Sequence, residues 1–225
     1  IEEAESSGIF PGLVRDVMTI TSSSLQATDE SSGYSTTNIQ VAGVDEADIV
    51  KTDGQYIYLA SNDRFIIVDA IPANEMKVVA EVSVNGSIIG LFTSEDRLII
   101  IKSGVTYYDE PQPVSSGIRR IVPGFSGYHI QVYNILSRDN PFLVKDVQVN
   151  GTYVNSRMIG DWVYAVASQP VITWAEEKRE VVLPEVSVDG KVSIVPATSI
   201  HYVINSDVPE VYTLVVALDA QSENQ

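Results

Sequence analysis

The sequence predicts an all-β fold of the β-propeller class, because one strand-rich pattern recurs along its 225 residues. Three stretches align without a gap: residues 39–53 (IQVAGVDEADIVKTD), 82–96 (VSVNGSIIGLFTSED) and 147–161 (VQVNGTYVNSRMIGD). Each has a glycine at its fifth position and an aspartate at its fifteenth. The copies begin 43 and then 65 residues apart, and a period near 43 residues with strand-like content is typical of a four-stranded blade.

The strands themselves are predicted by short runs rich in Val, Ile and Tyr, bounded by Gly, Asn, Asp or Pro. These runs group into three consecutive blades. The first blade comprises residues 47–52, 56–60, 65–69 and 78–84; the second comprises 88–92, 98–101, 129–133 and 143–149; the third comprises 153–158, 163–167 and 213–218. No window of twelve residues keeps the apolar spacing of an amphipathic helix. The turns Asn85-Gly86 and Asn150-Gly151 separate the blades, since Asn-Gly readily adopts positive φ.

Two insertions interrupt the pattern, at residues 104–127 in the second blade and 168–211 in the third. The second insertion contains an expected hairpin, residues 185–188 and 191–195, joined by Asp189-Gly190. Both insertions fall between the second and third strands of a blade. Equivalent loops leave a propeller on one face, so we expect the two insertions to project together, as binding loops on a rigid scaffold do.

The ends of the pattern are incomplete. Residues 1–37 read as an N-terminal segment with a Ser/Thr-rich linker, and the propeller domain is expected to span residues 38–225. Residues 39–42 match an outer strand with no blade before it, and the third blade has no outer strand. Three blades are fewer than the usual four to eight. Three interpretations stay open: part of a longer propeller, two chains that combine by self-association, or open edges.

Residues 34–59 (YSTTNIQVAGVDEADIVKTDGQYIYL) carry a specific resemblance. This stretch resembles the opening of the β-propeller in a family of archaeal and bacterial secreted proteins, whose C-terminal propeller is distantly related to WD-40 repeats. The match covers Thr37-Asn38, Gln40-Val41 and residues 43–54, and continues more loosely to Ala220. The resemblance implies a longer propeller and an extracellular or cell-surface location, often with an N-terminal anchor. It implies no functional residues.

Composition excludes several classes of function. Fourteen basic against thirty acidic residues give a net charge of −16, which repels phosphate backbones and makes nucleic acid a poor partner. No apolar run is long enough for a membrane-spanning segment, and the chain shows no signal peptide. The absence of cysteine excludes disulfides and thiolate chemistry.

Candidate catalytic and metal-binding residues are few. The two histidines, His129 and His201, read as ordinary strand and loop residues, and no motif of a hydrolase, a zinc protease or a nucleotide-binding loop is present. A weak Ca²⁺ site is predicted from the acidic cluster Asp45, Glu46, Asp48 and Asp53, which supplies hard oxygen ligands. The alternative is a turn role for Asp48 or Asp53, favoured by the recurrence of Asp53 as Asp96 and Asp161. No other cofactor is expected.

The remaining candidate sites lie in insertions and turns. Tyr107, Tyr108 and Trp174 are predicted ligand contacts because aromatic side chains in the insertions suit carbohydrate or peptide surfaces. Asn85 and Asn150 fit the N-glycosylation rule, although turn formation already explains both Asn-Gly pairs. The function expected is a non-enzymatic binding module for protein, glycan or cell-envelope material. The alternatives are part of an enzyme that needs further blades, and a structural envelope spacer.

Overall fold

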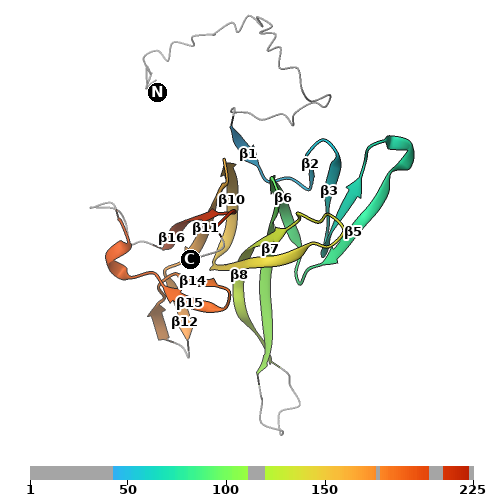
Figure 1. Cartoon of the computed structure of the whole chain (residues 1–225). Coiled ribbons are helices and arrows are strands. Elements are labelled where there is room, and N and C mark those ends of the chain that lie inside the picture. Colours follow the sequence, from blue (N-terminus) through green and yellow to red (C-terminus); the bar gives the residue numbers. More distant parts are fainter. Residues whose placement is uncertain (1–42, 111–119, 176–177, 203–209, 223–225) are drawn as a thin grey trace, which may run out of the picture. The chain divides into compact units, whose positions relative to one another are not determined.

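The computed structural model describes residues 43–110, 120–175, 178–202 and 210–222, without the side chains of residues 105–126 and 173–180. All of these residues belong to one compact unit, Gly33–Gln225 (Figure 1). The N-terminal segment and linker predicted for residues 1–37 lie outside the described residues, as do residues 39–42. In the described part of the chain, no helix is long and apolar enough to cross a membrane.

The first blade is a four-stranded antiparallel sheet, in the order β2-β3-β4-β5. Its strands are β2 (Val50–Thr52), β3 (Tyr56–Ser61), β4 (Arg64–Asp69) and β5 (Lys77–Ser83), with a 3₁₀ turn at Ala73–Glu75 before the last. The innermost strand is shorter than predicted, because residue 48 already forms a separate bridge to Leu91 of the next blade. The first blade therefore contacts the second through backbone hydrogen bonds as well as side chains.

The second blade has six strands instead of the four predicted, in the order β15-β14-β9-β8-β7-β6. They are β6 (Ile88–Ser94), β7 (Arg97–Glu110), β8 (Arg120–Asn134), β9 (Phe142–Asn150), β14 (Glu185–Val188) and β15 (Lys191–Ile194). The two extra strands are the hairpin predicted in the second insertion. β14 pairs with the outer strand β9 and so widens the sheet. A hairpin with a free edge satisfies its backbone groups by such pairing.

The third blade orders its strands β1-β10-β11-β16. They are β1 (Val44–Glu46), β10 (Thr152–Ile159), β11 (Trp162–Pro170) and β16 (Val211–Asp219). β1 lies beside the innermost strand β10, at the opposite edge of the sheet from β16. A separate hairpin of β12 (Ile172–Ala175) and β13 (Lys178–Val181) and a 3₁₀ turn at Ala197–Ser199 complete the second insertion. The charged run at residues 176–180 enters strand β13 at Lys178.

The first insertion is not a loop where the structure describes it. β7 and β8 continue through residues 104–110 and 120–127 as a long antiparallel arm, with paired residues out to Glu110 and Arg120 (Figure 1). Gly and Pro in this stretch are tolerated because a register shift follows Val105. The two insertions flank the outer strand β9 of the second sheet: Gly127 of the first pairs with Asn150 on one side, and Val186 of the second pairs with Val149 on the other.

Two separate hydrophobic cores join the three sheets. The first core lies between the first and second blades: Tyr58, Phe65, Ile67, Ala80, Val84, Leu91, Leu98, Ile100, Tyr133 and Ile135. The second core lies between the second and third blades and includes Phe92, Ile99, Ile101, Tyr128, Ile130, Val147, Met158, Val163, Leu214 and Leu218. Successive sheets that pack face to face are the defining feature of a propeller, so the predicted fold class is confirmed.

The repeat is visible in the geometry of its glycines. Gly86 and Gly151 have φ of +112° and +101°, and each lies against the backbone carbonyl of a serine seventeen residues further along, Ser103 and Ser168. Gly43 also has a positive φ of +82°, but a Cβ there would meet nothing within 4 Å. The second and third copies are therefore equivalent, whereas the first differs because β1 pairs with β10.

Candidate ligand groove around Arg138

Arg138 connects three turns of the first and second blades. It lies between β8 and β9, and its Nη2 donates to Oδ2 of Asp53 (3.3 Å) in the β2–β3 turn and to the carbonyl of Glu95 (3.2 Å) in the β6–β7 turn. Its Nη1 donates to the carbonyl of Ile135. One guanidinium with several fixed donors is suited to this role. The arrangement holds the turn end of two neighbouring blades in one place.

Asp53 is the acceptor at the centre of this arrangement. Its Oδ1 accepts hydrogen bonds from the backbone N–H groups of Gln55 (3.1 Å) and Tyr56 (2.8 Å), and Tyr58 Oη donates to its Oδ2 (2.8 Å). Partial burial raises the pKa of the Asp53 carboxyl, but the bonds from Tyr56, Tyr58, Gln55 and Arg138 outweigh it and leave the pKa lowered. Burial and the neighbouring Asp53 charge raise the pKa of Tyr58. Asp53 therefore acts as a charged turn residue.

We expect the Asp53 network to make the fold less stable in acid. A carboxyl with a folded pKa below its unfolded value of about 3.9 stabilises fully above that unfolded pKa, and the stabilisation disappears as the pH falls through the folded pKa. Urea unfolding from neutral pH to about pH 2 should therefore show a steeper acid decline for the parent chain than for Asp53→Asn. Equal slopes for both chains would show that Asp53 makes no such contribution.

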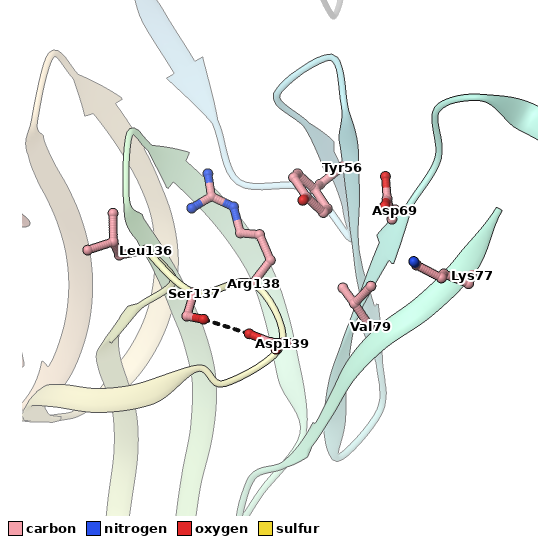
Figure 2. A pocket seen from close by; sticks show the side chains of 8 residues that line it. All are labelled: Tyr56, Asp69, Lys77, Val79, Leu136, Ser137, Arg138 and Asp139. Atoms are coloured by element: carbon pink, nitrogen blue, oxygen red, sulfur yellow. Dashed lines mark hydrogen bonds between the residues drawn. The ribbon is translucent and has the colours of Figure 1, made fainter. Parts of the chain in front are cut away.

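A groove with two halves lies along this network. One half, of about 420 Å³, is lined by Asp53, Gln55, Tyr56, Tyr58, Thr93, Glu95 and Arg138. The other, of about 410 Å³, is lined by Tyr56, Asp69, Lys77, Val79, Leu136, Ser137, Arg138 and Asp139 (Figure 2). Tyr56 and Arg138 line both halves, and the Arg138 Cζ lies 5.5 Å from the centre of the Tyr56 ring. This cation–π pair separates the two halves.

The second half of the groove contains charged groups without partners. Asp69 and Lys77 are register partners on β4 and β5, and neither side chain forms a hydrogen bond or an ion pair within the described residues. Asp69 Oδ1 and Arg138 Nε are buried and also have no hydrogen-bond partner there. Ser137 Oγ, in contrast, donates to Asp139 Oδ1 at 2.6 Å. A buried polar atom without a partner is costly, which favours a bound polar group at this position.

The second half of the groove is balanced in charge and partly apolar. Its acidic residues Asp69 and Asp139 are matched by Lys77 and Arg138. Leu136, which is 75% exposed, and Val79 add apolar surface beside them. Such a surface combines hydrogen-bond donors and acceptors with hydrocarbon contact, and so it suits a neutral polar ligand better than an ion.

The acidic cluster predicted to bind Ca²⁺ is dispersed in the structure. Asp45 accepts from Lys51 Nζ (2.6 Å), Glu46 pairs with Arg157 (3.0 Å), and Asp48 accepts from the backbone N–H of Ile49 (2.7 Å). Asp53 faces Tyr58 and Arg138. Among the residues with described positions, no group of three or more His, Asp or Glu side chains is placed to hold a metal ion. Asp45 and Glu46 are neighbours on β1, so their side chains point to opposite faces, whereas Asp48 lies in an isolated bridge and Asp53 in the β2–β3 turn.

The recurring aspartates share a backbone role in two copies. The carbonyls of Asp96 and Asp161 accept hydrogen bonds from the backbone N–H groups of Ile135 (2.8 Å) and Ala220 (2.9 Å), the residues that follow the third strand of each blade. Asp161 Oδ1 also accepts from Ser94 Oγ (2.6 Å) of the neighbouring blade. The carbonyl contacts are backbone contacts that any residue could make, whereas at Asp53 the side chain itself accepts backbone N–H groups of the turn.

The remaining sequence candidates lie away from the groove. The backbone of Tyr107 and Tyr108 belongs to β7 and that of Trp174 to β12, but their side chains are outside the described part. Asn85 and Asn150 lie at the blade-to-blade turns, and the Asn85 carbonyl accepts from Lys102 Nζ (2.6 Å). Among the histidines, His129 Nδ1 contacts Asp146 Oδ1 at 2.9 Å, and His201 is exposed beside a separate pocket.

Sequence reasoning missed the groove itself. The lining of its second half comes from strands β3 to β5 and from the β8–β9 connection, which are far apart in the sequence. The only available signal was the recurrent aspartate at the turn, which marks Asp53 but gives no indication of Arg138.

Comparison with known proteins places the whole described unit in one family. The β-propeller domain family matches residues 34–225. An uncharacterised protein of Methanocaldococcus jannaschii is 28% identical over 153 residues, which cover 68% of this chain and 20% of that protein. One from Archaeoglobus fulgidus is 28% identical over 204 residues, covering 84% of this chain and 27% of that protein.

No solved structure matches the chain. The matched part spans about a fifth to a quarter of the length of these two archaeal relatives. The family match covers all three blades and both cores, and it agrees with the face-to-face packing of successive antiparallel sheets. The chain belongs to the β-propeller domain family.

Proposed function

We propose that this chain is part of a β-propeller binding module, and that the groove around Arg138 binds a neutral, hydroxyl-rich ligand such as a saccharide. The observation that carries this proposal is the pair Asp69 and Lys77, two opposite charges that line one groove without partners in the described residues. The family resemblance supports a location outside the cell or at its surface, where glycans and envelope material are available.

The chemistry of the groove favours hydroxyl groups. A hydroxyl donates one hydrogen bond and accepts others, so it can donate to the Asp69 carboxylate while a neighbouring hydroxyl accepts from Lys77. Tyr56, Val79 and Leu136 offer surface for the hydrocarbon face of a sugar ring. Anions are disfavoured because the chain carries a net charge of −16. Hydrogen bonds to charged groups are stronger than those between neutral groups, and this added strength compensates for the limited contact area of a shallow site.

The test is a glycan array probed with the labelled chain, followed by calorimetric titration of the neutral oligosaccharide that binds best. Asp69→Asn and Lys77→Gln each keep the size of the side chain and remove its charge, and each should weaken binding about tenfold, as loss of one charged hydrogen bond does. Matched controls are Asp63→Asn and Lys191→Gln, which lie outside the groove lining and should leave affinity unchanged.

Three results would contradict the proposal. One is an array without any neutral glycan signal, and another is binding that survives both groove substitutions. The third is a preference for charged glycans or for zwitterionic peptides, which would assign the unpaired charges to ionic recognition. Circular dichroism and urea unfolding of each variant separate loss of the site from loss of the fold.

A further inference from the structure

The β6–β7 turn holds a glutamate in a backbone conformation that glutamate rarely adopts. Glu95 has a φ of +49° in the two-residue turn between Ser94 and Arg97. In the described part of the chain, the other non-glycine residues with positive φ are Asn62 and Asp189. Asn and Asp tolerate this conformation best after glycine, because their short polar side chains can form local hydrogen bonds. Glu95 is therefore the residue least suited to its backbone among these three.

The repeat shows that a turn of this shape does not need a glutamate. The equivalent β10–β11 turn of the third blade begins with Gly160, at a φ of +57°. Both turns have two residues, and in both an aspartate follows, Asp96 or Asp161. Glycine adopts positive φ without a steric penalty. Strain that is kept in one copy of a repeat and avoided in another points to a function for the side chain of Glu95.

The Glu95 side chain lines the first half of the groove and is exposed there. The Glu95 carbonyl accepts from Arg138 Nη2 at 3.2 Å, so the backbone of the turn is held in place. The Glu95 carboxylate, in contrast, forms no hydrogen bond or ion pair within the described residues, and the same is true of the Thr93 hydroxyl beside it. Arg138 and Asp53, which line the same half, are bonded to each other. The first half therefore offers an unused carboxylate and an unused hydroxyl.

We propose that Glu95 binds a second sugar ring, so that the groove takes a neutral oligosaccharide of at least two residues; this inference rests on the proposed function. One ring occupies the half that contains Asp69 and Lys77. The next ring occupies the other half, where the Glu95 carboxylate accepts hydrogen bonds from ring hydroxyls. The two halves have similar volumes, about 410 and 420 Å³, and each is within the range of ligand sites. Tyr56 and Arg138 line both halves, so the linkage between the rings passes over this pair.

Ligand length and one substitution test the second subsite. The probes are the disaccharide of the neutral glycan that binds best on the array and the methyl glycoside of its single sugar. NMR titration of the labelled chain measures both affinities, including weak ones, and the disaccharide should bind about tenfold more tightly or better. Glu95→Gln keeps the size of the side chain and removes its charge, so it should weaken disaccharide binding about tenfold and leave the single sugar unaffected. Asp69→Asn should weaken both.

Glu95→Gly separates a role in binding from a role in the fold. This variant loses the carboxylate but keeps the carbonyl that Arg138 contacts. Because glycine relieves the strain, the unfolding equilibrium constant measured in urea should fall about fivefold, while disaccharide binding weakens about tenfold. Asn62→Gly is the matched control. Asn62 has a φ of +51° and lies outside the groove lining, so its replacement should leave the binding of both sugars unchanged.

The second subsite is overturned if the disaccharide binds no more tightly than the single sugar. It is also overturned if Glu95→Gln leaves disaccharide binding intact or weakens both sugars equally, and if Glu95→Gly is less stable than the parent chain, since the side chain would then serve the fold. In each of these cases the proposed function still stands as long as Asp69→Asn weakens binding. If no neutral saccharide binds, the proposed function fails and the second subsite fails with it.

Discussion

Replacement of Gly86 by alanine should destabilise the fold by roughly 2–5 kcal/mol, one of the two largest effects expected for a single substitution at these sites. Gly86 has a φ of +112°, a conformation that residues with a Cβ rarely adopt. The added Cβ would also lie 2.4 Å from the backbone carbonyl oxygen of Ser103. Because Ser103 is held by hydrogen bonds to Ser87, the carbonyl cannot move away without breaking the start of the blade.

The repeat provides its own controls for this prediction. Gly151→Ala should behave like Gly86→Ala, since its φ is +101° and its Cβ would lie 2.8 Å from the Ser168 carbonyl oxygen. Gly43→Ala introduces backbone strain alone, because nothing lies within 4 Å of that position, and should cost only about 1–2 kcal/mol. Urea unfolding of the three variants measures these differences. Equal losses at Gly43 and Gly86 would show that the close approach to Ser103 contributes nothing.

Arg138→Ala should be the second most damaging change, with a loss of roughly 2–4 kcal/mol. Arg138 is only about one-fifth exposed, and its removal takes one donor from Asp53 and one from each of the carbonyls of Glu95 and Ile135. The turns of the first and second blades would then lose a shared contact. The packing of the arginine stem and its cation–π contact with Tyr56 are lost as well.

The matched control for this change is Arg157→Ala. Arg157 also pairs with a carboxylate, Glu46, but it is twice as exposed as Arg138, and exposed ion pairs contribute about 0–1 kcal/mol. Thermal and urea unfolding compare the two variants. If Arg157→Ala proves as harmful as Arg138→Ala, the contacts between the turns are not what makes Arg138 important. Saccharide binding by a folded Arg138→Ala chain should also be weaker, since Arg138 lines both halves of the groove.

Local signals in the sequence were sufficient for most of the strands. The hairpin of β14 and β15 was predicted because Asp189-Gly190 favours a tight turn, and Asp189 does adopt a positive φ of +49°. The blade-to-blade turns at Gly86 and Gly151 were predicted for the same reason. Side-chain alternation and turn residues act over a few neighbouring positions, so they can be recognised without knowledge of the tertiary structure.

Pairing between distant elements was not predictable in this way. Nothing in the sequence indicated that β14 pairs with β9 or that β1 pairs with β10. Strands pair through backbone hydrogen bonds, and every residue type except proline offers the same backbone donor and acceptor. The groove was missed for a related reason. Asp53 and Arg138 are 85 residues apart and come together only after two sheets have packed on each other. The basic partners of Glu46 and Asp53 could not be recognised from the sequence either, since Arg157 and Arg138 lie far along the chain.

The run from Leu98 to Ile101 in β7 has no side that water reaches, since Leu98 and Ile100 face one core while Ile99 and Ile101 face the other. The middle blade is therefore unable to persist by itself as a soluble species. When one flanking blade has packed against the middle blade, the opposite face of the middle blade is still apolar and exposed to water, and only the other flanking blade can cover it. The three blades therefore depend on one another for stability, and loss of either outer blade should destabilise the other two.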